Sequence, residues 1–294
     1  MPDAASQSWT TRTLLAWIAD RFAAAGLDSP RLSAEILLTH VVGGDRLGLY
    51  TDPDRPATDA ERDRLRDLVK RALDHEPVQY LVGAWSFYGV ELATDARALI
   101  PRPSTETLVE RVLTEAKSTP IGTLVDLCTG SGCVAIALAR HLPETRVIAT
   151  DVCAQALSLA AENVERAGLA DRVELREGPL LDPIAGEGPF DAIVSNPPYI
   201  PDREWADVEA NVKNHEPHKA LRGGSDGLDL VRPILDEAPG LLTPGGLLAV
   251  ELAASHARTV LRSAERDGRL EDAQLLRDHE GLDRVLVARR CEPN

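Results

Sequence analysis

The feature that most constrains the fold is a regular alternation that begins near residue 123. Short apolar segments (TLVDL, RVIATD, RVELREG, FDAIV and LLAVEL) alternate with longer helix-like segments such as CVAIALARHL and AQALSLAAENVERAGL. Short apolar runs are typical of strands buried on both faces, and strand–helix alternation is typical of doubly wound α/β domains. The pattern therefore predicts a mostly parallel sheet. The closing pair QLLRD and DRVLVARR, with a short turn between them, predicts an antiparallel edge.

The first third of the chain has a different pattern. Residues 10–27, 29–44 and 57–75 place apolar side chains at helical spacing, and Thr58 and Glu61 are spaced as a capping box. The segment WSFYGVELATDARALIPRP, with a central glycine and closing prolines, is typical of a β-hairpin. We therefore expect a helical bundle over 1–84, a hairpin linker over 85–103 and the α/β domain over 104–294.

Composition limits the classes of function. The formal net charge of −15 argues against direct binding of nucleic acid, which relies on Lys and Arg. Four cysteines without a CxxC pair indicate reduced thiols rather than disulfides or zinc. The N-terminus lacks the pattern of a signal peptide, and no apolar run is long enough to span a bilayer. We expect a cytoplasmic protein that does not bind membranes.

A glycine-containing turn follows the first apolar segment. Ligands of open α/β sheets bind beyond the carboxyl ends of the strands, and glycines let the backbone approach a ligand closely. Asp151 ends the next segment, where a carboxylate can bind the hydroxyls of a ribose. The candidate cofactor residues are Asp126, Cys128, Thr129, Gly130, Ser131, Gly132 and Asp151.

Two cofactors fit this turn. One is NAD, whose glycine fingerprint tolerates an alanine such as Ala135 at its third position. The other is S-adenosylmethionine, which has a ribose but no pyrophosphate. Asp126 favours the second, because an acid suits a ligand with a sulfonium and an ammonium group. A tight turn without any ligand is the remaining interpretation.

The segment Asn196-Pro197-Pro198-Tyr199 follows the FDAIV run. Because the two prolines make the strand end rigid, the Asn196 side-chain oxygen and the Pro197 carbonyl can both accept hydrogen bonds from one NH2 group. Such a pair suits the methylation of a planar nitrogen, whose delocalised lone pair is a poor nucleophile. Tyr199 can stack on the planar group. The simpler alternative is a proline-capped strand end with a surface tyrosine.

A metal site is not expected. His215 and His218 are three residues apart, but Pro217 lies between them and no further ligand cluster accompanies them.

The residues resemble a known family at this point. The segments DLCTGSG, ATD, VSNPPYI, IPRPSTETLVE and EPHKALRGGSDGLDLVR are similar to those of the bacterial protein-(glutamine-N5) methyltransferases of peptide chain release factors, the PrmC/HemK family. The similarity covers nearly the whole chain, and the IPRP and EPxxAL segments are more specific than NPPY.

The resemblance implies a seven-stranded, Rossmann-like class I S-adenosylmethionine-dependent methyltransferase domain. The implied reaction methylates the glutamine of the Gly-Gly-Gln motif in class-1 release factors. The turn and Asp151 match the cofactor segment, to which Asn196 also contributes, and Asn196, Pro197, Pro198 and Tyr199 match the substrate segment. Arg102, Pro103 and Glu106 match a segment that borders the site.

Three positions depart from the family pattern. Cys128 replaces the usual first glycine of the turn, and we expect binding to survive because a thiol is small. Ser104 replaces a usual glutamate. Gly178-Pro179-Leu180-Leu181 stands where an acidic and an aromatic residue often flank the adenine, so we expect an apolar adenine contact from Leu180.

Alternatives remain within and beyond the family. A ribosomal-protein glutamine or an adenine N6 nitrogen could be the methylated group, although a DNA enzyme should carry a basic groove and a recognition insert, and the region after NPPY is short. A non-catalytic nucleotide-binding module or an NAD enzyme is the most distant alternative. We expect a monomer whose helical bundle docks the protein substrate.

Overall fold

The computed structural model describes residues 9–292, and it divides the chain into two compact units. One unit comprises the chain up to Gly83 together with Glu209–His215, and the other comprises Ala84–Val208 and the chain from Glu216 onward. The first eight residues of the expected bundle and the last two of the expected α/β domain lie outside the described residues.

The first unit is helical. Its elements are α1 (Thr11–Ala24), α2 (Pro30–Val42), α3 (Gly48–Thr51), α4 (Asp59–Leu73), α5 (Val78–Val82) and α9 (Ala210–His215). The capping box expected from Thr58 and Glu61 is confirmed: the Thr58 hydroxyl accepts from Glu61 N, and the Glu61 carboxylate accepts from Thr58 N. The buried core includes Leu14, Ile18, Phe22, Leu37, Leu38 and Leu65.

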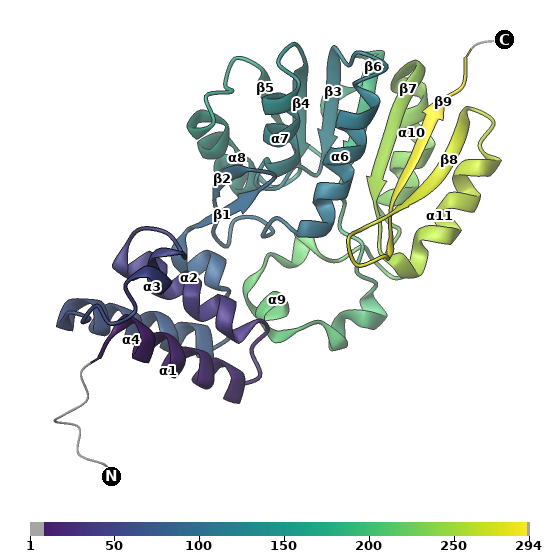
Figure 1. The fold of residues 1–294 in the computed structure, drawn as a ribbon. Helices are drawn as coiled ribbons and strands as arrows, with labels where there is room; N and C mark the ends of the chain where they lie inside the picture. Colours follow the sequence, from purple (N-terminus) through teal and green to yellow (C-terminus); the bar gives the residue numbers. More distant parts are fainter. Residues whose placement is uncertain (1–8, 293–294) are drawn as a thin grey trace. The chain divides into compact units, whose positions relative to one another are not determined.

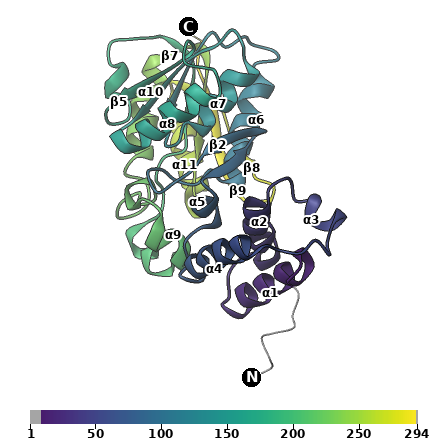
Figure 2. The ribbon, with the colours of Figure 1, turned by 90° about the vertical axis from the view of Figure 1, so that its left-hand side faces the viewer.

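Helix α9 joins this unit from a distant part of the sequence. Helix α9 lies beside α4 (Figure 2). The His215 ring nitrogen Nε2 lies 3.1 Å from the backbone oxygen of Asp74, just beyond the end of α4. The sequence patterns did not indicate α3, α5 or this contribution from residues 209–215, because each segment is too short to show a helical period.

The second unit is built on a seven-stranded sheet, as expected. Its strands are β3 (Thr123–Leu127), β4 (Arg146–Asp151), β5 (Val173–Glu177), β6 (Phe190–Ser195), β7 (Leu242–Glu251), β8 (Leu270–Arg277) and β9 (Asp283–Arg290), in the order β5-β4-β3-β6-β7-β9-β8 (Figure 1). The strands from β5 to β7 are parallel, whereas β9 is antiparallel to β7 and to β8. The predicted parallel sheet with an antiparallel edge is confirmed.

Helices cover both faces of this sheet. Alternate residues of β3 point to opposite faces, so Leu124 belongs to one buried cluster and Val125 to the other. The first cluster includes residues of α6 (Glu106–Glu115), α7 (Cys133–His141) and α8 (Ala154–Arg166), and the second includes residues of α10 (Val231–Leu241) and α11 (Ala254–Arg266). This two-faced core is the physical basis of the doubly wound arrangement.

A two-stranded hairpin, β1 (Ala84–Phe87) and β2 (Val90–Ala93), precedes the sheet and confirms the predicted hairpin. The buried Asn163 of α8 holds it, because its amide accepts from Ala93 N at 2.7 Å and donates to Ala93 O at 3.1 Å. Among the described residues, no helix is both long and apolar enough to cross a membrane.

Two elements differ from the expectation. The helix α6 was not foreseen, because the prolines of the IPRP segment dominated that part of the sequence. The strand β7 begins at Leu242 rather than at Leu247, and Leu242 pairs with Phe190 of β6. A Pro-Gly-Gly stretch normally ends a strand, but here β7 continues through it with an irregularity of register beside β6.

Candidate active site

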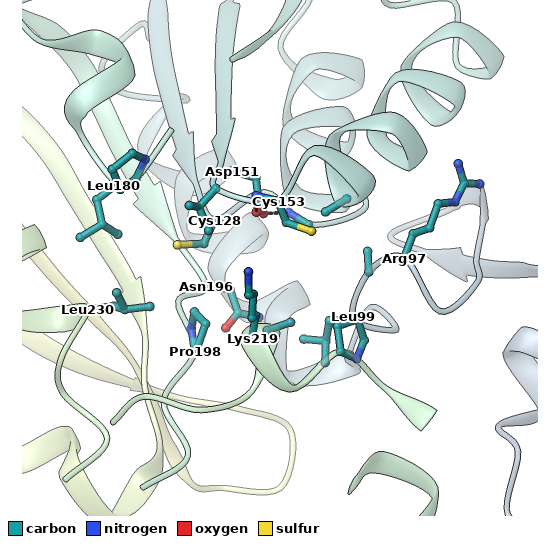
Figure 3. Close-up of a pocket in the computed structure, with 17 residues that line it drawn as sticks. Arg97, Leu99, Cys128, Asp151, Cys153, Leu180, Asn196, Pro198, Lys219 and Leu230 are labelled. Carbon is teal, nitrogen blue, oxygen red and sulfur yellow. Dashed lines mark hydrogen bonds between the residues drawn. The ribbon is translucent and has the colours of Figure 1, made fainter. Parts of the chain in front are cut away.

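A cavity of about 220 Å³ opens beyond the carboxyl ends of β3, β4 and β6 (Figure 3). Six of the residues expected at the site line it, namely Cys128, Gly130, Asp151, Leu180, Asn196 and Pro198. A second cavity of about 30 Å³ is lined by further predicted residues, among them Arg102, Asp126, Thr129 and Ser131, and shares Cys128, Gly130 and Asn196 with the first. The fold therefore brings most of the predicted residues together, as parallel strand ends should.

Asp126 organises the turn after β3. It is 1 % exposed, and its Oδ2 accepts from the Thr129 hydroxyl at 2.6 Å and from Ala135 N at 3.2 Å. Burial raises the pKa of Asp126 to about 7, and these two hydrogen bonds only partly oppose the rise. Asp126 thus closes the turn from inside, while it also borders the smaller cavity.

Backbone conformation explains the glycines and one departure from the family pattern. Gly130 and Gly132 have φ angles of 58° and 81°, in the left-handed region that glycine adopts freely. Cys128 has a φ of 59°, in the same region. A cysteine at this φ is strained, which the argument from the small size of the thiol did not include. That cofactor binding survives the replacement stays a prediction. Burial raises the pKa of the Cys128 thiol to about 12, so the thiol is neutral.

Asp151, at the end of β4, borders the larger cavity. Its Oδ2 accepts from Gly130 N and its Oδ1 from Cys153 N, both at 2.9 Å. Burial raises the pKa of Asp151, against the effect of these backbone hydrogen bonds. Each carboxylate oxygen can accept more than one hydrogen bond, so the side chain keeps capacity for a ligand while the backbone fixes its position.

Leu180 belongs to the apolar part of the wall. It has a φ of 44°, and its carbonyl accepts from the Thr150 hydroxyl at 3.2 Å, which holds the loop after β5 against β4. Pro179, Leu230 and the exposed Val152 line the same cavity. One side of the cavity is therefore apolar and the other carries the Asp151 carboxylate.

Asn196, directly after β6, lies at the border of both cavities. Its side-chain Nδ2 donates to the Thr105 hydroxyl oxygen at 3.1 Å. The preceding Ser195 is fully buried and donates to Leu127 O at 2.9 Å, which joins the end of β6 to that of β3. Pro197 and Pro198 are both buried.

The role of Tyr199 as a wall beside the substrate stays a prediction. Tyr199 is not among the residues that line either cavity, and its hydroxyl interacts with Glu251 at the end of β7. Burial, together with the charge of Glu251, raises the pKa of the phenol to about 12. The Tyr199 hydroxyl therefore lies near the end of β7.

Arg102 and Glu106 also have partners within the protein. Arg102 forms an ion pair with Glu216, whose other oxygen accepts from Ile100 N at 3.1 Å. Glu106 does not line the cavities, and its Oε1 accepts from Tyr88 N at 2.9 Å in the turn of the hairpin. Arg102 borders the smaller cavity, whereas Glu106 connects α6 to the hairpin.

Several lining residues were not singled out from the sequence, among them Arg97, Leu99, Cys153, Lys219 and Leu230. The Arg97 guanidinium pairs with Asp95 and Glu162 and points away from the cavity (Figure 3). The Lys219 side chain extends into the cavity (Figure 3). Its position inside the EPxxAL segment was the one sequence signal that could have identified it.

The described residues contain no group of three or more His, Cys, Asp and Glu side chains arranged to hold a metal ion. His218 instead packs edge-on against Trp205, with ring centres 4.8 Å apart. All four cysteines are free thiols.

The sequence of this chain matches those of known protein families. Residues 13–83 match the family described as "PrmC N-terminal domain", and residues 103–215 match the "Methyltransferase small domain". A release factor glutamine methyltransferase of Geobacter sulfurreducens is 42% identical over 281 residues, which cover 96% of this chain and 97% of that protein. One from Rhodopirellula baltica is 39% identical over 287 residues, which cover 96% and 97%.

Solved structures share the fold. The hMettl16 catalytic domain, solved in complex with the MAT2A 3'UTR hairpin 6, has a TM-score of 0.55 at 16% identity, and the match covers 81% of this chain and 83% of that one. The sequence relatives are far closer and match along almost their full lengths. The chain belongs to the family of the release factor glutamine methyltransferases.

Proposed function

We propose that this protein transfers a methyl group from S-adenosylmethionine to the side-chain nitrogen N5 of the glutamine in the Gly-Gly-Gln motif of class-1 release factors. The observation that carries the proposal is the identity of 42% to a release factor glutamine methyltransferase, which extends over 96% of the chain and so includes both units. The candidate site also supports the proposal, because its cavity is lined by Asp151, a carboxylate suited to bind a ribose, and by Asn196 at a rigid strand end.

The larger cavity fits a nucleoside-bearing cofactor. Its apolar wall of Pro179, Leu180 and Leu230 suits a purine, and Asp151 can accept from the two hydroxyls of a ribose. A Cβ added at Gly130 would meet no atom within 4 Å, so the backbone of the turn faces open space. A glycine there lets a ligand approach the backbone closely.

The cofactor supplies an electrophilic methyl group on a positively charged sulfur. The protein holds the two reactants. Asp151 and the apolar wall fix the nucleoside end, and Asp126 lies at the smaller cavity, where the Asn196 side chain also lies. Much of the rate gain from such a site is positional, because a bound pair of reactants reacts as a single molecule.

Asn196 and the Pro197 carbonyl act on the substrate amide. Two acceptors hold both N–H bonds of the glutamine NH2 group, which favours a tetrahedral nitrogen with an available lone pair. They also stabilise the positive charge that develops on the nitrogen as the methyl group arrives. A strong base is not needed for attack, because the methylated nitrogen is acidic and loses its proton afterwards.

The acidic surface supports a protein substrate over a nucleic acid. A net charge of −15 repels phosphates, whereas a glutamine side chain on a protein carries no charge to be repelled. We further propose that the enzyme works as a monomer in the cytoplasm, where the thiols of its four cysteines stay reduced.

Mass spectrometry tests the proposal. Purified class-1 release factor is incubated with this protein and S-adenosylmethionine, and the Gly-Gly-Gln peptide should gain the mass of one methyl group in place of a hydrogen. A release factor with Gly-Gly-Glu in that position is the matched control and should gain nothing. Methylation of a ribosomal protein or of DNA alone would contradict the proposed substrate.

A further inference from the structure

A chain of buried polar side chains runs from Asn196 to Glu251. Thr105 is 1 % exposed, and its hydroxyl oxygen accepts from Asn196 Nδ2 at 3.1 Å. Thr105 ends the short 3-10 helix Pro103–Thr105 and occupies the N-cap position of α6 without a capping hydrogen bond from its side chain, whereas Glu251 ends β7. Because Val250 pairs with Ser195, the residues that follow them, Glu251 and Asn196, leave neighbouring parallel strands side by side.

Glu251 has one hydroxyl partner and two more hydroxyl groups nearby. Its side chain is fully buried, and Ser104 Oγ donates to Oε1 at 3.3 Å, whereas Oε2 has no hydrogen-bond partner among the described residues. The hydroxyls of Thr105 and Tyr199 lie close enough to lower the pKa of the carboxyl group. Burial raises the pKa of Glu251 to about 6, while these hydroxyls and the charge of Arg284 oppose the rise. Near neutral pH Glu251 is therefore mainly an ionised carboxylate, which only accepts hydrogen bonds.

The Glu251 carboxylate determines whether the Thr105 hydroxyl acts as a hydrogen-bond donor or acceptor toward Asn196. A hydroxyl has one hydrogen and two lone pairs, and the nearby carboxylate, whose Oε2 lacks a partner, attracts the hydrogen of Thr105. The side of the hydroxyl that faces Asn196 can then only accept. Asn196 must turn its NH2 group toward Thr105, so its Oδ1 is free to face a ligand at the border of the two cavities.

The reverse orientation would be harmful to the reaction. If the Asn196 amide turned over, its NH2 group would meet the NH2 group of the glutamine, and two donors cannot form a hydrogen bond. An asparagine side chain alone does not choose between the two orientations, because its oxygen and nitrogen ends have nearly the same shape. Some other group has to make the choice.

We propose that Thr105 and Glu251 are positioning residues that fix the orientation of the Asn196 amide, so that its oxygen is presented to the substrate NH2 group. The inference rests on the proposed function, since it assigns to Asn196 the role of acceptor. It also explains why Tyr199 and Ser104 lie behind the strand end: their hydroxyls help to stabilise the buried carboxylate that Thr105 needs.

Threonine variants give the kinetic test. Thr105→Val keeps the shape of the side chain and removes the hydroxyl, and Thr105→Ser keeps the hydroxyl. We expect Thr105→Val to lower kcat for methyl transfer about tenfold or more, with the affinity for S-adenosylhomocysteine within about threefold of the wild type, and Thr105→Ser to restore most of kcat. A folded Thr105→Val enzyme with the kcat of the wild type, or equal losses in both variants, would overturn the inference.

Nuclear magnetic resonance reads the orientation without any reaction. In the wild type, the Asn196 side-chain NH2 protons should show Overhauser contacts with the Thr105 methyl group, and Glu251→Gln, which adds a donor beside Thr105, should weaken them. Absence of these contacts in the wild type would overturn the proposed orientation. A wild-type protein that shows the contacts but methylates no release factor would contradict the proposed function and leave the orientation standing.

Discussion

Two neighbouring strand ends form the site, and the structure holds them in different ways. After β3, the side chain of Asp126 closes its turn with Thr129 and Ala135, three and nine residues away. After β6, the side chain of Asn196 bonds to Thr105, which is 91 residues away in the sequence. The turn after β3 is thus built largely from its own segment, whereas the orientation of Asn196 depends on the whole fold.

The difference matches the two tasks. A cofactor turn must present backbone and leave open space, and positive φ angles at Cys128, Gly130 and Gly132 achieve that locally. A side chain that stabilises the transition state must have a fixed orientation, and hydrogen bonds to residues of other elements hold that orientation. Variants at the two strand ends should therefore fail differently, one in methyl transfer and the other in binding or stability.

The largest effect is expected at Asn196. Asn196→Ala removes one of the two proposed acceptors for the substrate NH2 group, so kcat should fall by about 10²–10³-fold, the usual range when one such polar group is lost. The affinity for S-adenosylhomocysteine, measured by calorimetry, should change little, because the residues proposed to contact the nucleoside lie on β4 and the loop after β5. Turnover near that of the wild type would contradict the acceptor role.

A smaller effect is expected at Asp151, on binding. Asp151→Ala removes the proposed acceptor of the ribose hydroxyls, and calorimetry should show affinity for S-adenosylhomocysteine about tenfold weaker or more. Glu177 is a matched control: it pairs with Asp151 across β4 and β5 but is exposed and does not line the cavity. Glu177→Ala should bind normally, and an equal loss in both variants would argue against a specific ribose contact.

The sequence predicted those parts of the site that are local. The turn after β3, Asp151 at the end of β4 and the rigid NPPY segment each follow an apolar run, so strand–helix alternation alone placed them on one edge of the sheet. The alternation also predicted the two faces of the core, because every parallel strand must be covered on both sides.

Other features could not be read from one sequence, because they depend on residues that meet only after folding. Glu106 bonds to Tyr88 rather than lining a cavity, and Tyr199 reaches Glu251 behind the strand end. Thr105 and Glu251 carry no pattern of their own that marks them as partners of Asn196. Likewise, nothing in the sequence of residues 209–215 shows that they complete the helical unit.

Asp126, which closes the turn after β3, should make the stability of the protein depend on pH. The pKa of Asp126 is about 7 in the folded protein, because of burial, and 3.8 is its ordinary value. Below pH 3.8 both states hold the proton, and between pH 3.8 and 7 only the folded state keeps it, so stability decreases as pH rises and levels off above 7. Asp126→Asn should therefore reduce the fall in unfolding free energy between pH 5 and 8 by about 2.6 kcal/mol.

Urea unfolding of the ligand-free protein at pH 5 and pH 8 measures this pH dependence. Asp278 is the control, because its pKa is lowered in the folded protein whereas that of Asp126 is raised. Burial opposes ionisation of Asp278, but hydrogen bonds from Leu282 N and Arg284 hold its pKa below the ordinary value. It is ionised in both states at pH 5 and at pH 8, so Asp278→Asn should lower stability equally at both. An unchanged pH dependence in Asp126→Asn would show that Asp126 is ionised in the folded protein.

The smallest effect is expected where the turn departs from the family pattern. Cys128→Gly relieves a left-handed conformation that costs a non-glycine residue about 1 kcal/mol, but glycine loses more backbone entropy on folding, so the net gain in unfolding free energy should be about 0.5 kcal/mol. Cys153 lines the same cavity at an ordinary φ of −106°, so Cys153→Gly relieves no strain and should lower stability. Urea unfolding of the two variants compares them directly. If both substitutions lowered stability alike, the contacts of the Cys128 thiol would outweigh its strain, and the side chain, not only the backbone, would help to hold the turn after β3.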